Sequence, residues 1–560
     1  MTDKIEEIAN VRTTAGTKEN YASRATLAEL KDAGFAIANY DANVWNMVES
    51  GDVLTANLKN GCTLASDGLT PVVSVNASVV DLTQGETAQI VPSTVNGSDA
   101  VVAVSYGYSV TPANVVSVDM YGKVTALNPG VATVTVTAYA ADKIVTTNVT
   151  VNVAAPSYTL TAVGATTQTI LTKAVDGYNS TASLEVEVDK WESGMVISWT
   201  SSNAAIATVA AGTDSRTAVV TPAANSVGGP VTITANTDGA LAPVTFTINT
   251  YVPISNEADL YGMNANTVAK TAYKNVIGAN YANLWGDINN YCDNLIQGYY
   301  MMTGDITLTN SDPNNTDTQN SQKYYKSAIV GRSTGWNKLG SGFNGVFDGN
   351  GYKISGAKFN INATYQALFG ANQGIIKNVE MVMEPWAWTT ADFPNYTIRK
   401  YSGVICAYNA GVIENCYVNT EINADNMNGT TSCVSGALVY QTHYWASSVK
   451  NCFVDMKVTR CLADQNAALG NLAAFVALYD NGTLDNCYGI KTGLTDQVQD
   501  IIRRGTAGTA TNYATATDLA GLKTAGFDAS KYDSNVWSFV ENEGSLTVSL
   551  KDGCTLAKLQ

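Results

Sequence analysis

Alternation of apolar and polar residues dominates residues 70–153 and predicts β-strands. Runs such as Val131-Ala132-Thr133-Val134 put every second residue on an apolar face, and turn sequences such as Gly122-Lys123 separate the runs. This is the pattern of a half-buried antiparallel sheet. Residues 156–252 repeat it with Trp199 in a central strand. We therefore predict two β-sandwiches, with Trp199 in the core of the second.

The pattern changes after residue 254, where a short helical segment precedes a series of related segments. Four of them share an asparagine followed by a small or apolar residue, about 36 residues apart: Asn378-Val379, Asn415-Cys416, Asn451-Cys452 and Asn486-Cys487. A period of this length indicates a solenoid. We expect the asparagines to stack at one turn with their amides bonded along the axis, and the cysteines to stack inward as small apolar groups.

The two ends of the chain carry copies of one short module. Residues 21–65 and 513–557 align without a gap, and about 25 of the 45 positions are identical. Each copy predicts a short amphipathic helix, at Leu27 and Leu519, stopped by Ala-Gly-Phe and followed by two short strands. Simple duplication without a special role is the alternative to a functional reason for the second copy.

The composition agrees with an all-β protein that binds no nucleic acid. Charged residues make up 14% of the 560 residues and the formal net charge is −16, so the basic surface that nucleic acids require is absent. The first residues lack the apolar segment of a secretory signal, and no apolar run reaches the 18 residues of a membrane span.

Nine cysteines occur without a Cys-x-x-Cys pair, which argues against a zinc site. We predict packed, unpaired thiols and folding in a reducing compartment. The nine positions are Cys62, Cys292, Cys406, Cys416, Cys433, Cys452, Cys461, Cys487 and Cys554.

The sequence contains few candidate catalytic groups. The single histidine, His443, falls in a long turn of the repeats, and no nucleophile or phosphate-loop motif is present. β-Solenoids can hydrolyse polysaccharides with paired carboxylates. The candidates are Asp348, Glu380, Glu384 and Glu414. Asp348 suits a turn, while Glu380 and Glu414 are expected on the outer face, so we predict no enzyme, no cofactor and no metal.

Two further groups invite a binding role. The segment with Asp312, Asn314, Asn315 and Asp317 offers oxygen ligands for Ca²⁺, but without the spacing of a calcium motif, so we expect a solvated loop. Trp386, Trp388 and Tyr396 form an aromatic insertion between repeats. It could contact a glycan or a protein, and packing of the loop against the solenoid flank is the alternative.

Two family resemblances follow from these motifs. Residues 122–126 and 130–134 resemble a group-2 bacterial immunoglobulin-like domain of the intimin and invasin type, although the tryptophan usual after its second strand is missing. The segments 347–356 and 368–380 resemble the GLUG-repeat β-solenoid family, in which a C-terminal segment similar to 512–560 closes the solenoid. Both resemblances imply structural or adhesive modules rather than an activity.

We therefore predict an all-β chain of two immunoglobulin-like β-sandwiches and a β-solenoid, with short helices in the duplicated terminal module. The expected division is 1–20, an arm; 21–67, a cap-like module; 68–154 and 155–253, the two sandwiches; 254–511, the solenoid; and 512–560, the C-terminal cap module.

The combination of extracellular-type modules and no export signal predicts a virion structural protein of a tailed bacteriophage: a capsid decoration, head fibre or other appendage on the virion surface. The alternatives are a bacterial cell-surface adhesin or wall-associated protein whose signal peptide was removed, and, less favoured, a polysaccharide-degrading tailspike. Expected partners are other virion or surface proteins and host glycans, in an oligomer. We expect the N-terminal module to be an anchor, through Leu27, Phe35, Val44 and Trp45.

Overall fold

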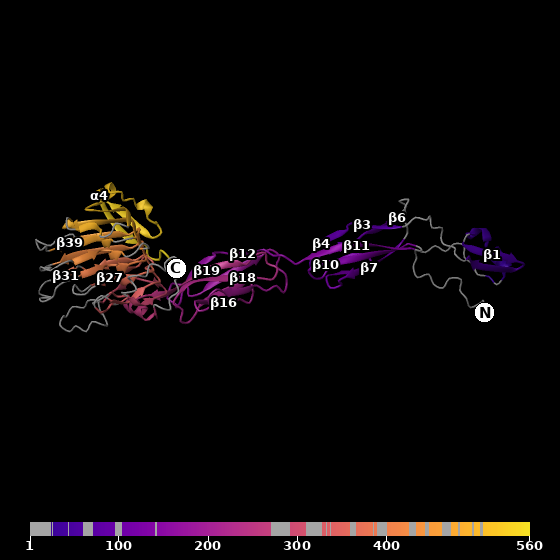
Figure 1. Ribbon diagram of the computed structural model, residues 1–560, viewed down its shortest axis with the longest axis horizontal. Coiled ribbons are helices and arrows are strands. Elements are labelled where there is room, and N and C mark those ends of the chain that lie inside the picture. Colours follow the sequence, from indigo (N-terminus) through magenta and orange to yellow (C-terminus); the bar gives the residue numbers. More distant parts are fainter. Residues whose placement is uncertain are drawn as a thin grey trace. The chain divides into compact units, whose positions relative to one another are not determined.

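The computed structural model of the chain consists mainly of β-strands and divides into two compact units, Met1–Ser157 and Tyr158–Gln560. The all-β prediction, with helices confined to short elements, is confirmed (Figure 1). The structure describes residues 24, 26–42, 44–59, 71–95, 104–140, 143–269, 292–309, 328–331, 333–335, 338–358, 366–384, 386–388, 400–424, 433–442, 447–461, 472–479, 482–495, 498–503 and 508–559.

The N-terminal module has the elements that its sequence predicts. Helix α1 (Leu27–Asp32) begins at a capping box between Thr26 and Glu29, and the chain leaves it through Gly34 with a positive φ of 96°. A 3-10 turn, η2 (Ile37–Asn39), precedes an antiparallel hairpin of β1 (Trp45–Ser50) and β2 (Val53–Leu58).

The first sandwich packs a core of small and β-branched side chains, with Val116, Val124 and Val134 fully buried. One sheet has the strand order β4-β11-β10-β7, the second β5-β9-β8, and β3 pairs with β6. The strands are β3 (Val72–Val75), β4 (Val79–Thr83), β5 (Thr87–Gln89), β6 (Pro92–Val95), β7 (Ser105–Thr111), β8 (Val116–Val118), β9 (Lys123–Ala126), β10 (Gly130–Ala140) and β11 (Lys143–Ala154).

The second sandwich belongs to the second unit. Trp199 packs against its core beside Phe246 and donates a 2.7 Å hydrogen bond to the Ser215 carbonyl, although part of the ring remains exposed. Strands β12, β14, β17 and β16 form one sheet, and β13, β15, β18 and β19 the other. Their bounds are β12 (Leu160–Val163), β13 (Thr167–Leu171), β14 (Ala182–Val188), β15 (Ser198–Ser201), β16 (Ala207–Ala211), β17 (Thr217–Pro222), β18 (Gly229–Asn236) and β19 (Val244–Ile254).

Strand β19 joins the second sandwich to the solenoid without a break in hydrogen bonding. Its first part pairs with β18, and its end pairs in parallel with β22 (Tyr299–Met302) of the solenoid. The sandwich sheet and one solenoid sheet are therefore one 17-stranded sheet. The boundary expected at residue 253 lies inside a strand. After it come the predicted helix, α2 (Glu257–Gly262), and the turn η3 (Met263–Ala265).

The described residues between 292 and 516 form the coils of the predicted parallel β-solenoid (Figure 1). A typical coil has β33 (Cys406–Asn409) in the 11-stranded sheet, then β34 (Val412–Glu414) and β35 (Tyr417–Ala424) in the 17-stranded sheet, with Asn415 at the turn between the last two. Each strand pairs in parallel with its counterpart in the next coil.

Most of the remaining solenoid strands also pair in parallel, whereas Thr267–Ala269 and Ser333–Gly335 each pair antiparallel with a neighbouring strand. The remaining strands are β20 (Thr267–Ala269), β21 (Cys292–Ile296), β23 (Ile306–Thr307), β24 (Ser333–Gly335), β25 (Lys338–Phe343), β26 (Val346–Asp348), β27 (Lys353–Ala357), β28 (Phe369–Asn372), β29 (Ile375–Lys377), β30 (Glu380–Met383), β31 (Trp386–Trp388), β32 (Lys400–Gly403), β36 (Cys433–Gly436), β37 (Val439–Thr442), β38 (Ser448–Lys450), β39 (Phe453–Cys461), β40 (Leu472–Tyr479), β41 (Thr483–Gly493), β42 (Val498–Arg503) and β43 (Thr509–Ala516).

The C-terminal module repeats the N-terminal order of elements: α4 (Leu519–Thr524), η7 (Ala529–Lys531), β44 (Trp537–Asn542) and β45 (Ser545–Leu550). It packs on side chains from three successive coils, Tyr417, Phe453 and Tyr488. The module therefore lies along the flank of the solenoid, instead of serving only as a lid on its last coil.

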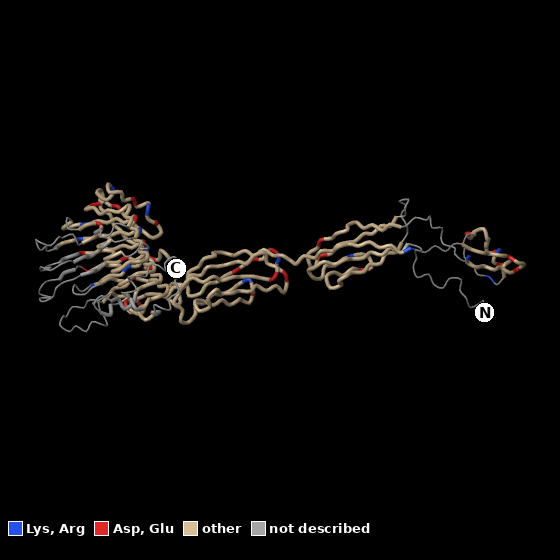
Figure 2. The backbone as a smooth tube through the Cα atoms, in the orientation of Figure 1, with Lys and Arg blue, Asp and Glu red and all other residues tan. Residues whose placement is uncertain are grey.

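Charged residues are sparse over the described chain, and acidic and basic positions are interspersed (Figure 2). Among the described residues, no helix combines the length and the apolarity that crossing a membrane requires.

A column of close backbone contacts runs along one corner of the coils. A Cβ added to Gly374 would overlap the carbonyl oxygen of Gly345, and one added to Gly411 would overlap that of Gly374. Glycine is needed here because adjacent coils approach too closely for any side chain.

We expect Gly374→Ala to lower the free energy of unfolding by at least about 3 kcal/mol, because the methyl group must push two coils apart. Chemical denaturation of the full chain measures the effect. Gly304→Ala is the control, since its added Cβ meets nothing within 4 Å. Equal stability of the two variants would contradict the tight stacking.

Candidate functional site

The turn asparagines form a ladder, as the repeat predicts. Asn378, Asn415, Asn451 and Asn486 all have φ between 51° and 56°, and Asn350 and Asn512 extend the series at either end with φ of 53° and 50°. Asparagine tolerates this left-handed conformation better than most residues. The same turn therefore recurs in successive coils, one above another.

The predicted bonding between amides holds for part of the ladder. Asn415 Nδ2 donates to Asn378 Oδ1 at 3.2 Å, and Asn486 Nδ2 donates to Asn451 Oδ1 at 2.9 Å. The ladder is interrupted after Asn415, whose Oδ1 has no hydrogen-bond partner among the described residues. At the last rung a carboxylate replaces the amide oxygen, because Asn512 donates to Asp485 at 2.8 Å.

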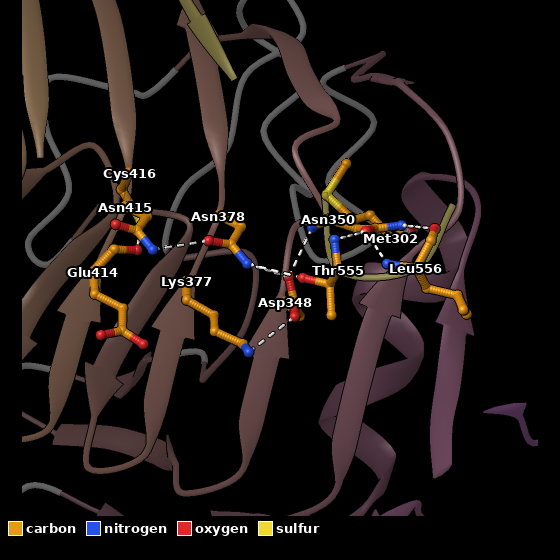
Figure 3. A network of polar contacts seen from close by, with 10 residues as sticks. All are labelled: Met302, Asp348, Asn350, Lys377, Asn378, Glu414, Asn415, Cys416, Thr555 and Leu556. Carbon is orange, nitrogen blue, oxygen red and sulfur yellow. Dashed lines mark hydrogen bonds and ion pairs between the residues drawn. The ribbon is translucent and has the colours of Figure 1, made fainter. Parts of the chain in front are cut away.

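The C-terminal tail, residues 553–559, closes the first end of the ladder (Figure 3). Asn350 Oδ1 accepts the backbone N–H groups of Thr555 and Leu556 at 2.8 and 2.9 Å, and Asn350 Nδ2 donates to the Leu556 carbonyl at 3.0 Å. Asn378 Nδ2 donates to Thr555 Oγ1 at 3.0 Å. Residues about 200 positions apart in sequence thus satisfy one buried amide.

Asp348, a sequence candidate for catalysis, is a structural residue of this network. It is fully buried, and its Oδ1 accepts the Asn350 N–H at 2.9 Å and Asn378 Nδ2 at 3.0 Å (Figure 3). Lys377 Nζ lies 3.2 Å from Oδ2. Burial lowers the pKa of Lys377, but the Asp348 carboxylate, Tyr251 and Glu414 together outweigh it, and the pKa lies above its ordinary value.

Charges of alternating sign flank the ladder in register. Strand pairing places Lys377 beside Asp348 and Glu414, and Lys450 beside Glu414 and Asp485. Lys450 Nζ lies 2.7 Å from Glu414 Oε2. Each acidic group in this row thus has a basic neighbour, which suits a stacking contact rather than a pair of carboxylates on a substrate.

Glu380 differs from the expectation of an outer-face residue. It is 8% exposed, and its Oε2 accepts the Leu550 N–H of the C-terminal module at 3.0 Å. Burial raises its pKa, and the hydrogen bond from Leu550 lowers it by less. Glu384 is exposed and directly follows β30, the strand that begins at Glu380. The geometry thus gives Glu380 a docking contact.

A second asparagine ladder, not predicted from the sequence, lies at another turn of the coils. Asn372 Nδ2 donates to Asn409 Oδ1 at 2.8 Å, and each side-chain oxygen also accepts a backbone N–H, from Gly374 and Gly411 respectively. Both asparagines are fully buried. The repeated Asn-x-Gly at 372–374 and 409–411 is the signal that could have revealed it.

The cysteine stack is confirmed. Cys416, Cys452 and Cys487 are fully buried and carry no disulfide. Phe453 N donates to the Cys416 carbonyl and Tyr488 N to the Cys452 carbonyl, so the three cysteines occupy successive coils. Burial raises the pKa of Cys416 and Cys487, which keeps these thiols protonated.

The residues after these cysteines form the flank to which the C-terminal module docks. We name Tyr417, Phe453 and Tyr488 the aromatic row. Phe527 of the module makes edge contacts with Phe453 and Tyr488, with ring centroids 5.8 and 5.6 Å apart, and Phe539 contacts Phe453 at 5.8 Å. The aromatic row is therefore the surface of the solenoid to which the folded C-terminal module binds.

Two polar contacts orient the docked module. Tyr488 OH donates to the Gly526 carbonyl at 3.0 Å, and Tyr532 OH donates to the carbonyl of the ladder residue Asn486 at 3.0 Å. Beneath the module, Tyr417 OH donates to Asp455 Oδ2 at 2.6 Å. Burial raises the pKa of Asp455 from 3.8 to about 6, and the bond from Tyr417 opposes the shift by less.

The expected anchor residues of the N-terminal module differ in how far they are buried. Leu27 is buried, while Phe35, Val44 and Trp45 are half-buried. Phe35 and Trp45 both contact Tyr40, with ring centroids 5.6 and 5.9 Å apart. That these residues anchor the module to a partner remains a prediction.

The other aromatic candidates are placed only in part. Trp386 and Trp388 lie in β31, which pairs in parallel with β35, so this segment is a solenoid strand and the expected loop insertion is wrong for it. The side chains of both tryptophans, the whole of Tyr396, His443 and the segment 312–317 fall outside the described residues.

No cluster of three or more histidine, cysteine, aspartate or glutamate side chains suited to a metal occurs in the part of the chain that the structure describes.

Cys452→Ser is expected to lower the free energy of unfolding by about 1–3 kcal/mol, because it places a hydroxyl between two thiols in an apolar column. Cys452→Ala separates this polar cost from the loss of volume. In the native protein all three stacked thiols should react slowly with a thiol reagent, and fast labelling of all three would contradict the buried stack.

Asp455 is expected to make stability fall as pH rises from about 4 to about 6. Its pKa is raised in the folded state, so the folded protein binds the proton more tightly than the unfolded chain. Asp455→Asn should therefore be about 1–2 kcal/mol more stable than the wild type at pH 7.5 and of similar stability at pH 4. Denaturation curves at both pH values test this, with the exposed Glu384→Gln as control. A stability difference between Asp455→Asn and the wild type that does not change with pH would contradict this role of Asp455.

Comparison with known proteins finds distant similarity to solved structures only. No known protein family matches the chain, and no curated protein matches it. Among solved structures, the S-layer protein SbsC (residues 31–844) is 18% identical with a TM-score of 0.20, over 33% of this chain and 28% of that one. Titin domains Z1Z2, in a complex with telethonin, are 13% identical with a TM-score of 0.20, over 32% and 95%. Human protocadherin-24 EC1-2 is 14% identical with a TM-score of 0.16, over 32% and 97%. The chain thus spans just over a quarter of the SbsC chain, and these distant similarities concern immunoglobulin-like modules.

Proposed function

We propose that this chain is a non-catalytic structural protein of a bacterial cell surface, in which immunoglobulin-like modules carry a rigidly attached β-solenoid. The observation that carries the proposal is strand β19, which belongs to the second sandwich and to the solenoid sheet at once. A flexible linker would let the two parts move independently, whereas a shared strand makes them one body.

Further contacts stiffen this junction. Tyr299 N donates to the Val227 carbonyl at 2.8 Å, and Tyr178 OH of the sandwich lies 2.7 Å from Tyr352 OH of the solenoid. The tail residue Leu559 donates its N–H to the Gly177 carbonyl at 2.7 Å. Sandwich, solenoid and tail therefore meet in one packed region, as suits a part that must hold its shape under load.

The engaged carboxylates support a role without catalysis. A glycosidase needs one carboxyl as acid and a second as base or nucleophile on either side of a bound sugar. Asp348 is fully buried, Glu380 is covered by the C-terminal module, and Glu414 forms an ion pair with Lys450. The polysaccharide-degrading alternative therefore has little support.

A second candidate is the virion appendage expected from the sequence. The observation in its favour is the column of buried thiols without disulfides, because such a chain suits folding in a reducing cytosol before release by lysis. The bacteriophage role stays a prediction, and so do the group-2 immunoglobulin and GLUG assignments.

Location and inertness can be tested together. Antibodies raised against the chain should label intact producing cells, and the purified protein should release no reducing ends from capsular or wall polysaccharide. Labelling of purified virions and not of cells would favour the appendage. Sugar release that disappears in both Asp348→Asn and Glu414→Gln, with folding intact, would refute the non-catalytic role.

A further inference from the structure

The two terminal modules share a tertiary fold as well as a sequence. Lys31 Nζ lies 2.5 Å from Glu49 Oε2 in the N-terminal copy, and Lys523 Nζ lies 2.6 Å from Glu541 Oε2 at the corresponding place in the other. Both copies also have the same order of helix, 3-10 turn and hairpin. The docked C-terminal copy therefore shows which face of the N-terminal copy could dock.

That face is largely retained in sequence. Eight side chains of the C-terminal module are buried in one cluster with the aromatic row, and seven have an identical counterpart, while Val548 corresponds to Ala56. Phe539, which also contacts Phe453, corresponds to Met47. The identical pairs are Leu27 and Leu519, Leu30 and Leu522, Phe35 and Phe527, Tyr40 and Tyr532, Val44 and Val536, Trp45 and Trp537, and Leu58 and Leu550.

Six of these seven residues are more exposed in the N-terminal copy than their counterparts, and only Leu27 is buried in both copies. Tyr40 is 40% exposed where Tyr532 is 4% exposed, and Leu58 is 59% exposed where Leu550 is 5% exposed. Away from this face the copies agree, since Val48 is 51% exposed and Val540 is 54% exposed. The fold of the module alone thus leaves an apolar face that an aromatic row buries in the other copy.

The copied unit also includes the end of a solenoid. Upstream of the module, Thr14-Ala15-Gly16-Thr17 and Asn20-Tyr21-Ala22 match Thr506-Ala507-Gly508-Thr509 and Asn512-Tyr513-Ala514. In the second set, Asn512 is the last asparagine of the ladder, and Tyr513 lies in the last solenoid strand, β43. The N-terminal copy therefore carries in its sequence what is needed to adjoin a solenoid.

The chain's own aromatic row is already occupied by the C-terminal module. We propose that the N-terminal module docks onto the flank of a β-solenoid carried by a separate protein molecule, with aromatic side chains stacked from successive coils. This proposal goes beyond the surface role and does not depend on where the protein is located.

The docked copy specifies the chemistry of the partner. Stacked aromatics would receive Phe35, as Phe453 and Tyr488 receive Phe527. A carboxylate one coil before the row would accept the N–H of Leu58, as Glu380 accepts that of Leu550. A turn carbonyl would accept the hydroxyl of Tyr40, as the Asn486 carbonyl accepts that of Tyr532.

The test uses the chain's own aromatic row as the probe. A full-length receptor carries Phe527→Asp and Trp537→Asp, which release its C-terminal module, and Trp45→Asp, which prevents it from binding to itself. The wild-type chain is the donor, and mass photometry measures the complex. We expect a one-to-one complex, weakened about tenfold or more by Trp45→Asp in the donor, since a buried tryptophan dominates such contacts.

The matched control is Val48→Asp in the donor, whose counterpart Val540 stays exposed in the docked module. It should bind as the wild type does. Equal binding of the Trp45→Asp donor, or no binding to a folded receptor, would overturn the proposal. So would self-association of the wild-type chain through Trp45, since its aromatic row is covered.

If the receptor fails to fold, a module exchange replaces it. Residues 26–58 are grafted in place of 518–550 of the full chain, so that docking becomes intramolecular. The grafted module should resist limited proteolysis as the native one does, and Trp45→Asp in the graft should abolish that resistance. A graft that is cleaved as readily with Trp45 as without it would refute the fit.

Discussion

Parallel pairing between successive coils is the constraint on which the solenoid depends. Because each strand pairs in register with its counterpart, every coil position is stacked on the same position of the next coil. Each position must therefore hold a residue type that can pack against the equivalent residue of the coil before and the coil after it. Asparagine amides bond to one another, cysteines and aromatic rings pack, glycines let backbones approach, and Lys377, Glu414 and Lys450 alternate in charge.

This constraint explains how much could be predicted from the sequence. The ladder at Asn378 to Asn486 and the cysteine stack were found because they recur at nearly constant spacing. The two sandwiches were found because half-buried strands alternate. The second ladder at Asn372 and Asn409 obeys the same rule, but it recurs in too few coils to stand out.

Contacts between segments far apart in sequence could not be predicted in this way. The burial of Glu380 depends on Leu550, and the role of Asn350 depends on Thr555 and Leu556. The local sequence shows only that Glu380 is polar and near a turn, and such a residue is expected to be exposed. Only the position of the module on the flank turns this carboxylate into a buried hydrogen-bond acceptor.

The tail that bonds to Asn350 has a consequence for how the solenoid comes apart. A linear stack of coils is expected to fray from its ends, since a terminal coil has one neighbour. Here the segment that follows the last coil returns along the flank and is held at an early coil by Thr555 and Leu556. Loss of the last coil is therefore coupled to release of the tail, so the coils and the module should melt as one cooperative unit instead of peeling away one by one.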